Sequence, residues 1–526
     1  MEDFAELAGL NLDPVLAQRV QAKLQQLSEY NQQLLQQTQQ LTIQTQQDAA
    51  ALKLANAKIQ ALTLELAHHK RLRFGKTSEA FSSEQRQLFE ESVDADTAAI
   101  ETEIAQLDSA PVAKRTRPSG RQVLPDHLPR IEHRHEPDTC TCPQCGKDLI
   151  KIREDISEQL DVEPARFFVH RHIRPQYACR ACETITAEAI PPAVIQGSLA
   201  APGLHAWVII QKYLDHLPLY RIERISTRYG VPIARSTLAN WVGQIGVALQ
   251  PLADRLAELL RQRRILHADE TPVPQLDPGN GKTKRAYLWA YRSNDHDPGP
   301  PILIFDYQPG RSGDYARRFL KDWRGHLMVD DDGGYKALFT QGITELACLA
   351  HMRRKFFDLH TANQSPIASL ALQHIAELYA LEQEAHGMPT QERQQLRQTL
   401  AKPKLEAFHA WLQQTRRTVA DGSGTAKAID YSLKRWTAFI RYTDHGNLPI
   451  DNNPIENAIR PIAIGKKNWL FAGSERAGQR AAAIQSLLGT AKLNGIEPMA
   501  WLKETLEKLP TWPNSRIDAL LPLNDA

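Results

Sequence analysis

The sequence lacks an excess of charge of either sign. Its 526 residues contain 63 Lys and Arg against 61 Asp and Glu, which gives a formal net charge of +2. A chain so near neutrality is not a polycation, so any contact with nucleic acid must come from local basic patches. The sequence also has no run of 18 apolar residues, and its first residues, MEDFAELAGL, are acidic and unlike a signal peptide. We therefore expect no membrane contact and a cytoplasmic location.

Cysteine is scarce, with six in the chain, and five of them fall within one short segment. In a long chain without an export signal, such clustering favours a metal site over disulfides. Cys142 and Cys145 form one C-x-x-C pair, and Cys179 and Cys182 form a second. Two such pairs offer four thiolates to one tetrahedral ion, so we predict structural zinc that folds a module and does not catalyse. Cys140 is a spare thiol and an alternative to Cys142.

Proline and glycine are absent from residues 15–70, which are rich in Gln, Leu and Ala. One unbroken heptad frame runs through this segment, and the core positions in its middle are polar. The pattern predicts a coiled coil through which the chain forms a homo-oligomer, with polar core positions that set register at a cost in stability. The alternatives are a single amphipathic helix and Gln-rich disorder.

The segment 217–246 has the spacing of a helix-turn-helix motif. A first helix is predicted to end near Tyr229, Gly230 allows a tight turn, and Ser236 offers an N-cap for a second helix. Base or phosphate contacts are expected from the front of that second helix, at Arg235, Ser236, Thr237 and Asn240. Two helices joined by a glycine turn are also common in α-rich domains that bind no DNA.

Short apolar strands follow one another from residue 264 onward. We predict strands at 264–269, 286–292, 301–307, 325–330 and 345–351, with a helix at 313–323. Three strands, a helix and a further strand is the order of a ribonuclease-H-like sheet, in which the first and fourth strands lie side by side. Asp269 ends the first strand and Asp330 ends the fourth, so their carboxylates are expected to converge.

Converging carboxylates suit phosphodiester cleavage by two divalent cations, which lie about 3.5–4 Å apart between oxygen ligands. Magnesium keeps several waters and needs few protein ligands, so three acidic residues suffice. Asp269 and Asp330 supply two of them. The third must come from a later helix packed on the sheet edge, and Glu456 is the candidate.

Glu456 stands in the segment DNNPIENAIRP, which reads as the start of a helix. Asn453 suits an N-cap and Pro454 the first helical position, so Glu456 falls where a capping-box glutamate would lie. Closing the helix end is therefore the alternative role of Glu456. Asp451 is the rival acid, interpreted as a turn residue.

Several longer motifs are shared with a known family. They are KRLRFGKTSE, the paired cysteines, KYLDHLPLYR, LHADETPVP, CLAHMRRKFFDLH, DNNPIENAIRPIAIGKKNWLFAGS and SLLGTAKLNG, and they span nearly all of residues 70–524. On these motifs the chain resembles the IS66 family of transposases, which carry a DDE catalytic triad. The resemblance implies that Asp269, Asp330 and Glu456 bind the metal ions. It also implies a helical insertion at about 365–445 and accessory proteins encoded by the same element.

The second acid of the triad stands in a run of three, within MVDDDGGYKALF. Family members usually show a single Asp here, and the following glycine and tyrosine align with the family when Asp330 is the ligand. Asp332 would share its strand face and stays the alternative. Glu270, next to Asp269, would point to the opposite face of its strand.

Basic residues follow the acidic positions and are candidates for phosphate contacts. They are Arg353 and Arg354 in one cluster, and Arg460, Lys466 and Lys467 in another. A solvated helix face is the alternative for the first cluster. Trp469 is interpreted as a core residue in preference to a base-stacking one. His267 and His351, which flank the acidic positions, are interpreted as structural groups in preference to ligands.

Together these features predict a multidomain α+β protein. Its predicted parts are a coiled-coil helix (1–75), a linker (76–125), a zinc ribbon-like module (126–195), a helix-turn-helix region (196–262), a ribonuclease-H-like α/β catalytic core (263–490) and a C-terminal helical tail (491–526). The predicted function is that of a bacterial DNA transposase, bound to the nucleoid when on DNA. It would bind element ends, cut double-stranded DNA with Mg²⁺ or Mn²⁺ and transfer the strand to a target. The alternatives are a zinc and helix-turn-helix regulator with an inactive core, and a nuclease that never joins.

Overall fold

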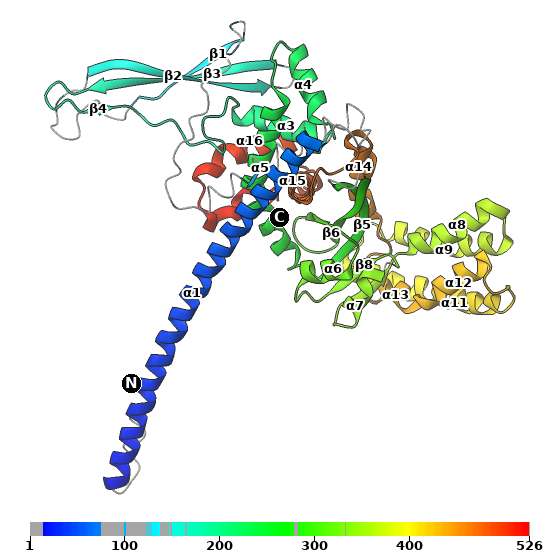
Figure 1. Ribbon diagram of the computed structural model, residues 1–526. Helices are drawn as coiled ribbons and strands as arrows, with labels where there is room; N and C mark the ends of the chain where they lie inside the picture. Colours follow the sequence, from blue (N-terminus) through cyan, green and yellow to red (C-terminus); the bar gives the residue numbers. More distant parts are fainter. Residues whose placement is uncertain are drawn as a thin grey trace. The chain divides into compact units, whose positions relative to one another are not determined.

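The structure is a computed structural model that describes residues 14–74, 99–100, 124, 126, 128–136, 147, 150–163, 166–277, 282–331 and 333–524. The chain divides into two compact units, Met1–Leu66 with Ile100–Thr116, and Ala67–Ala99 with Arg117–Ala526. The first unit contains most of one long helix, and the second contains both sheets and the helices that follow them (Figure 1). No helix in the described ranges is long and apolar enough to cross a membrane.

Helix α1 (Pro14–Phe74) is continuous over 61 residues. It begins at a proline, which suits the first helical position because its missing N–H would be unpaired there anyway. Large apolar side chains lie exposed along it, at Leu27, Leu34, Leu41, Leu52 and Ile59. The continuous helix agrees with the heptad pattern, and the pairing of two such helices stays a prediction.

The first sheet is a long ribbon. It contains β1 (Arg130–Arg134), β2 (Ile150–Glu163), β3 (Arg166–Ala178) and β4 (Ile185–Thr186). β2 and β3 pair antiparallel, β1 runs parallel to β3, and β4 pairs with the end of β3. One end of the ribbon buries Leu160 and Val169 in the core shared with the following helices, and the cysteines Cys179 and Cys182 lie at the other.

Three helices follow the ribbon, α3 (Pro202–Tyr213), α4 (Leu219–Arg228) and α5 (Arg235–Leu260). The predicted end of the first motif helix near Tyr229 is confirmed, and Gly230 makes the turn with a φ of +75°. The predicted N-cap at Ser236 is wrong, because the helix already begins at Arg235. The Arg235 N–H donates to the Glu223 carboxylate at 3.0 Å, so a side chain of α4 caps α5.

The second sheet has five strands in the order β7-β6-β5-β8-β9. They are β5 (Ile265–Asp277), β6 (Lys282–Ser293), β7 (Leu303–Gln308), β8 (His326–Val329) and β9 (Thr344–Ala347). β5, β6 and β7 pair antiparallel, whereas β8 runs parallel to both β5 and β9. The predicted neighbourhood of the first and fourth strands is therefore confirmed.

β5 extends well beyond its parallel neighbour β8. It pairs with β8 only over Ile265 to His267, whereas its pairing with β6 continues to Asp277. The prediction that Asp269 ends the strand is therefore wrong, because the hairpin with β6 carries the strand on. Past His267, the side of β5 that faces β8 no longer has a strand partner, and Asp269 lies in this part.

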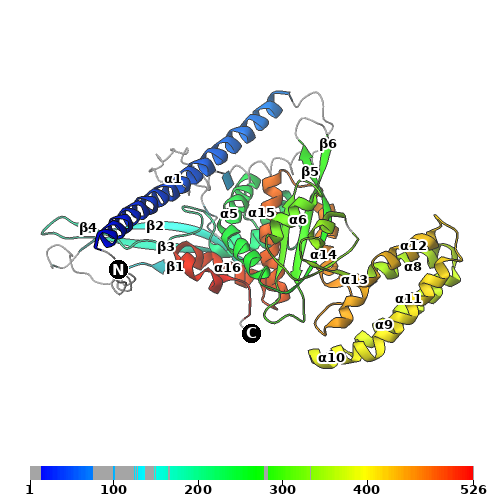
Figure 2. The ribbon, with the colours of Figure 1, turned by 90° about the horizontal axis from the view of Figure 1, so that it is seen from below.

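Helices cover both faces of the second sheet. On one face, Leu266 and Ala268 join the core formed with α5 and α6 (Gly313–Leu320). On the other, Val273 packs with Ile455 and Ile459 of α14 (Asn453–Trp469). Helix α15 (Glu475–Leu493) packs on both β7 and α5. Figure 2 shows α15 beside α5.

A helical insertion separates β9 from α14. It contains α8 (Leu349–Asn363), α9 (Pro366–Glu384), α10 (Thr390–Leu396), a π-helical turn (Arg397–Ala401), α11 (Lys402–Arg416), α12 (Gly424–Lys434), α13 (Trp436–Ile440) and a 3-10 turn (Arg441–Asp444). The expected helices within 365–445 are confirmed, and they pack around Phe356 and Phe408 in a core that also includes Met328 of β8 and Leu346 of β9. The shorter elements are a 3-10 turn (Gly333–Tyr335), α7 (Lys336–Phe339), α16 (Pro498–Lys508) and two final 3-10 turns (Leu509–Thr511, Asn514–Leu520).

Candidate active site

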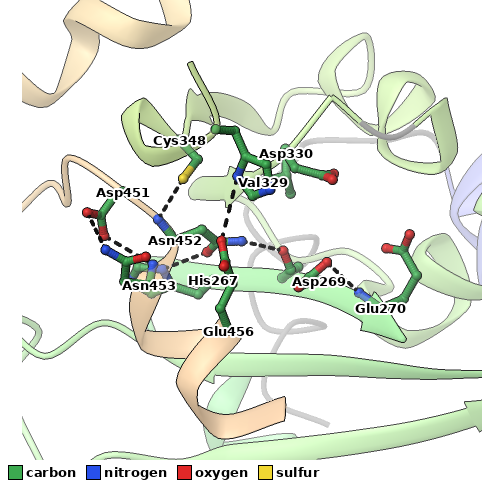
Figure 3. A network of polar contacts seen from close by, with 12 residues as sticks. His267, Asp269, Glu270, Val329, Asp330, Cys348, Asp451, Asn452, Asn453 and Glu456 are labelled. Carbon is green, nitrogen blue, oxygen red and sulfur yellow. Dashed lines mark hydrogen bonds and ion pairs between the residues drawn. The ribbon is translucent and has the colours of Figure 1, made fainter. Parts of the chain in front are cut away.

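Three carboxylates come from separate elements to the edge of the second sheet where β8 ends. Asp269 lies on β5, Asp330 directly follows β8, and Glu456 lies in the first turn of α14 (Figure 3). We call these three residues the acidic edge. Their mutual repulsion is strong enough that Asp330 and Glu456 both contribute to raising the pKa of Asp269. Asp330 and Glu456 thus lie within electrostatic reach of Asp269, but the three carboxylates do not form one group with oxygens within 4.8 Å of one another. Their joint role as metal ligands stays a prediction.

The pKa of the Asp269 carboxyl lies well above its ordinary value. Burial is the largest cause, because the charged form loses hydration. The neighbouring charges of Glu270, Asp330 and Glu456 add to it, and a hydrogen bond from the Glu270 N–H at 2.8 Å opposes it. Among the described residues, no Lys or Arg forms an ion pair with Asp269 or Glu456. A cation from outside the chain would therefore relieve this concentration of negative charge.

Asn452 ties helix α14 to the sheet. Its side-chain oxygen lies 2.9 Å from His267 Nδ1, and its amide group donates to the main-chain oxygen of Ala268 at 2.9 Å. Asn452, not Asn453, is the N-cap residue, and its side chain makes no capping hydrogen bond. The predicted capping box is therefore wrong, since the asparagine side chain is drawn to β5. His267 has the structural role expected of it.

Glu456 is left without a capping partner. Its Oε1 atom is buried and has no hydrogen-bond partner among the described residues, and the same is true of His351 Nδ1. These two atoms lie 3.6 Å apart, too far for a hydrogen bond. The rival acid Asp451 is fully engaged instead, because it accepts hydrogen bonds from Tyr379 Oη at 2.8 Å and from Asn453 N at 3.0 Å.

Glu270 faces the opposite side of β5, as strand alternation predicts. Its side chain is 1% exposed and pairs with Arg311, whose Nε donates at 2.7 Å. Tyr335 Oη donates to the other carboxylate oxygen at 3.0 Å. Burial raises the pKa of Tyr335 well above its ordinary value, so the phenol stays a neutral donor. Glu270 is thus neutralised by the protein itself.

The helical insertion contacts the strand end that bears Asp330. Arg435 is 5% exposed and donates to the main-chain oxygens of Val329 at 3.3 Å and Asp330 at 3.1 Å. The same guanidinium pairs with Glu345 at 2.7 Å. Sequence reasoning missed this anchor, because nothing local marks Arg435. Asp332 lies outside the described residues, so the choice of Asp330 over Asp332 stays a prediction.

The predicted basic residues near the acidic edge lie at the surface. Arg353 and Arg354 are exposed on α8, and Arg460 and Lys467 are exposed on α14. Lys466 donates to the main-chain oxygen of Pro272 at 3.0 Å. Trp469 packs against the core under α14, in agreement with its interpretation as a core residue. The phosphate contacts of the basic residues stay predictions.

The predicted contacts of the helix-turn-helix lie at the start of α5. Ser236 is exposed there, and Arg235, Thr237 and Asn240 are partly exposed. Leu238 and Trp241 are buried beneath them, which fixes the direction of the exposed side chains. The residues are thus available at one helix end, and their contact with DNA stays a prediction.

The second cysteine pair forms a tight turn after β3. The Cys179 N–H donates to Thr184 O at 2.9 Å, and the Glu183 N–H donates to Cys179 O at 2.8 Å. This turn holds Cys179 and Cys182 close together, as a zinc knuckle requires. Cys140, Cys142 and Cys145 lie outside the described residues, so the four-thiolate set stays a prediction.

A cluster of histidines on the ribbon was missed from the sequence. His133 Nε2 lies 2.8 Å from His170 Nδ1, and His135 Nε2 lies 3.0 Å from His172 Nδ1. Burial lowers the pKa of His172 to about 4, and the three neighbouring histidines add to the shift. The alternating histidines in IEHRHE and VHRHI carried this signal, because residues two apart share a strand face.

Four family models match the chain. The one described as Transposase IS66 family matches residues 197–480, and the zinc-finger binding domain of transposase IS66 matches residues 139–183. The IS66 C-terminal element matches residues 486–523, and Transposase C of IS166 homeodomain matches residues 61–132.

Similar curated proteins come from Sinorhizobium fredii (strain NBRC 101917 / NGR234). Uncharacterized protein y4qI is 38% identical over 493 residues, which cover 90% of each chain. Uncharacterized protein y4jD is 35% identical over 480 residues, 88% of this chain and 94% of its own. Uncharacterized protein y4hP is 32% identical over 487 residues, 88% of this chain and 87% of its own.

Proposed function

The chain belongs to the IS66 transposase family, and we propose that it cuts and joins DNA at the acidic edge. Family membership makes it a transposase-type nucleic-acid-processing enzyme with DNA as its partner. The finer proposal is a DDE mechanism in which Asp269, Asp330 and Glu456 hold two divalent cations, Mg²⁺ or Mn²⁺. The observation that supports it is the pKa of Asp269, which is raised by burial and by the nearby charges of Asp330 and Glu456.

The residues of the acidic edge fit such ions. All three offer carboxylate oxygens, the ligands that Mg²⁺ prefers. Glu456 Oε1 is buried without a hydrogen-bond partner in the described part of the chain, which is costly unless a cation binds it. The strand order of the second sheet, with β5 beside β8, supports our proposal that the core is ribonuclease-H-like.

The chain positions the carboxylates, and bound cations supply activation of the attacking oxygen and stabilisation of the leaving one. Asn452 fixes the start of α14, the helix that bears Glu456, against β5, the strand that bears Asp269. Arg435 fixes the main chain at Asp330. Water is the proposed first nucleophile and a DNA 3′-hydroxyl the second, so no covalent protein–DNA intermediate forms.

Other parts of the chain serve DNA binding and assembly in this proposal. The front of α5 and the zinc module bind the element ends, with one structural zinc ion held by Cys142, Cys145, Cys179 and Cys182. The zinc-finger family match supports that ion. Residues 15–70 join protomers, because two ends must be cut in one assembly. Accessory proteins of the same element complete the reaction.

The test is metal-dependent cleavage of DNA that carries the element's own ends, with the wild type and Glu456→Gln. Glutamine keeps the shape of the side chain but removes the charge that a metal ligand needs. We expect Glu456→Gln to lose cleavage while DNA binding and the melting temperature hold. Glu406→Gln, an exposed position on α11, is the matched control and should cleave as the wild type does.

Equal cleavage by the wild type and Glu456→Gln would exclude Glu456 as a ligand. DNA binding without cleavage by any of the three proteins would favour the regulator with an inactive core. Cleavage without strand-transfer products would favour a nuclease that never joins.

A further inference from the structure

A second set of metal-binding side chains lies beside the acidic edge. Cys348 directly follows β9 and is the N-cap residue of α8, without a side-chain capping bond. His351 lies in the first turn of α8, and Glu456 lies in the first turn of α14. One donor atom from each lies within 4.8 Å of the other two. A sulfur, a nitrogen and an oxygen donor therefore meet at the start of two helices.

Two of these donor atoms lack any other partner. His351 Nδ1 and Glu456 Oε1 are both buried without a hydrogen bond in the described part of the chain, and they face each other at 3.6 Å. Two ligands of one tetrahedral zinc ion, with bonds of about 2.1 Å, lie about 3.4 Å apart. The separation is thus too long for a hydrogen bond and suits an ion held between the two atoms.

Cys348 supplies the third donor. Its thiol is buried and accepts a hydrogen bond from the Asn452 N–H at 3.1 Å. Burial raises the pKa of this thiol to about 12, so it keeps its proton in the absence of a cation. A metal ion would displace that proton to solvent as the sulfur–metal bond forms, and the Asn452 N–H would go on donating to the bound thiolate.

We propose that Cys348, His351 and Glu456 form a binding site for Zn²⁺ or a similar borderline-soft divalent ion. A sulfur, nitrogen and oxygen donor set selects zinc over magnesium, which takes oxygen ligands. Three protein ligands leave a fourth position open for water. This site is separate from the cysteine module on the ribbon.

The site also regulates catalysis, and this part rests on the proposed function. Glu456 belongs to both donor sets, so a zinc ion bound by Cys348 and His351 takes the carboxylate away from the acidic edge. Zinc is then an inhibitor of the magnesium-supported reaction. The affinity of Cys348 and His351 for zinc sets the Zn²⁺ concentration at which the reaction is inhibited.

The binding test uses cobalt, whose bond to a thiolate gives a near-ultraviolet absorption band. The full-length chain is first saturated with one equivalent of Zn²⁺ to fill the cysteine module, which prefers zinc to cobalt. Titration with Co²⁺ should then give one equivalent of sulfur-bound cobalt in the wild type. Cys348→Ala should abolish the band, and His351→Asn should weaken binding roughly tenfold or more. His360→Asn, on the same helix, is the control.

Absence of the band in the wild type, or an unchanged band in Cys348→Ala, would overturn the proposed site. This readout needs no catalysis, so it separates the zinc site from the proposed function. In cleavage assays, each variant is compared with its own rate without zinc. Half-inhibition should require roughly tenfold more Zn²⁺ for Cys348→Ala than for the wild type. Equal zinc sensitivity would overturn the regulatory part.

Discussion

The two faces of β5 treat neighbouring carboxylates in opposite ways. Glu270 faces α6 and is paired with Arg311 and Tyr335, so the protein supplies its countercharge. Asp269 faces α14 and lies among other acids, with its pKa raised. The two residues are adjacent and both are largely buried, yet only Glu270 is paired with a positively charged side chain of the protein. On this strand, burial alone does not distinguish the two acids, and the missing countercharge of Asp269 within the described ranges marks it as the functional candidate.

The geometry of the sheet produces this difference. Alternation along the strand sends adjacent side chains to opposite faces. β5 also continues past the end of β8, which leaves room beside Asp269 for the residue after β8 and for the start of α14. On the α6 face the core is closed around Tyr335, so the carboxylate there needs a fixed partner.

The largest expected effect is on catalysis, from Asp269→Asn. We expect cleavage to fall on the order of 10³-fold, because a neutral amide binds divalent cations poorly and those cations stabilise the negative charge of the transition state. The fold should lose no stability, since a carboxylate repelled by its neighbours becomes a neutral amide. Cleavage rates and thermal melting measured on the same samples check both parts. A stable Asp269→Asn variant that still cleaves at the wild-type rate would show that the Asp269 carboxylate, like that of Glu270, is not needed for the reaction.

The opposite pattern is expected from Glu270→Gln. Removal of this charge weakens both the pairing with Arg311 and the hydrogen bond from Tyr335, which should lower the free energy of unfolding by about 2 kcal/mol. This loss of stability is smaller than for a fully buried ion pair, because Arg311 is 47% exposed and its charge is partly screened by water. Urea unfolding measures it, with Glu258→Gln, from the surface pair with Arg255, as the control.

A wild-type unfolding curve for Glu270→Gln would show that its ion pair contributes nothing. If folded Glu270→Gln lost as much cleavage activity as Asp269→Asn, the side chains on both faces of β5 would be needed for the reaction.

A smaller loss of cleavage activity is expected from substitution of Arg435, the cation that contacts the main chain at Asp330. Arg435 donates to main-chain oxygens at Asp330 and pairs with Glu345. Arg435→Lys keeps the charge but cannot span these partners, because an ammonium lacks the planar fork. We expect cleavage to fall roughly tenfold, as for other groups that orient ligands, and to recover partly at higher Mg²⁺ concentration. A loss that no magnesium concentration reduces would assign Arg435 to folding alone.

The sequence predicted the parts of the site that depend on local pattern. Strand alternation correctly separated Asp269 from Glu270, and the strand–helix order correctly put the first and fourth strands together. The N-cap was misplaced by one residue, because Asn452 bonds to His267, which lies 185 residues earlier. Arg435 escaped notice for the same reason, as its partner Asp330 is 105 residues away. Contacts over such separations leave no periodic signal in a single sequence.

The last effect, and the weakest, is on how the melting temperature depends on pH when no divalent ions are added. Asp269 has a folded-state pKa above its unfolded value of about 3.9, so the folded protein binds its proton more tightly. Its contribution favours folding at low pH and is lost as pH rises through the folded-state pKa. The melting temperature of the wild type should therefore fall relative to Asp269→Asn as pH rises from about 4, by roughly 2–4 °C. Millimolar Mg²⁺ should narrow the gap at neutral pH, because bound ions stabilise the charged form. Parallel melting curves at all pH values, unchanged by magnesium, would mean that the acidic edge is already neutralised within the protein, as Glu270 is.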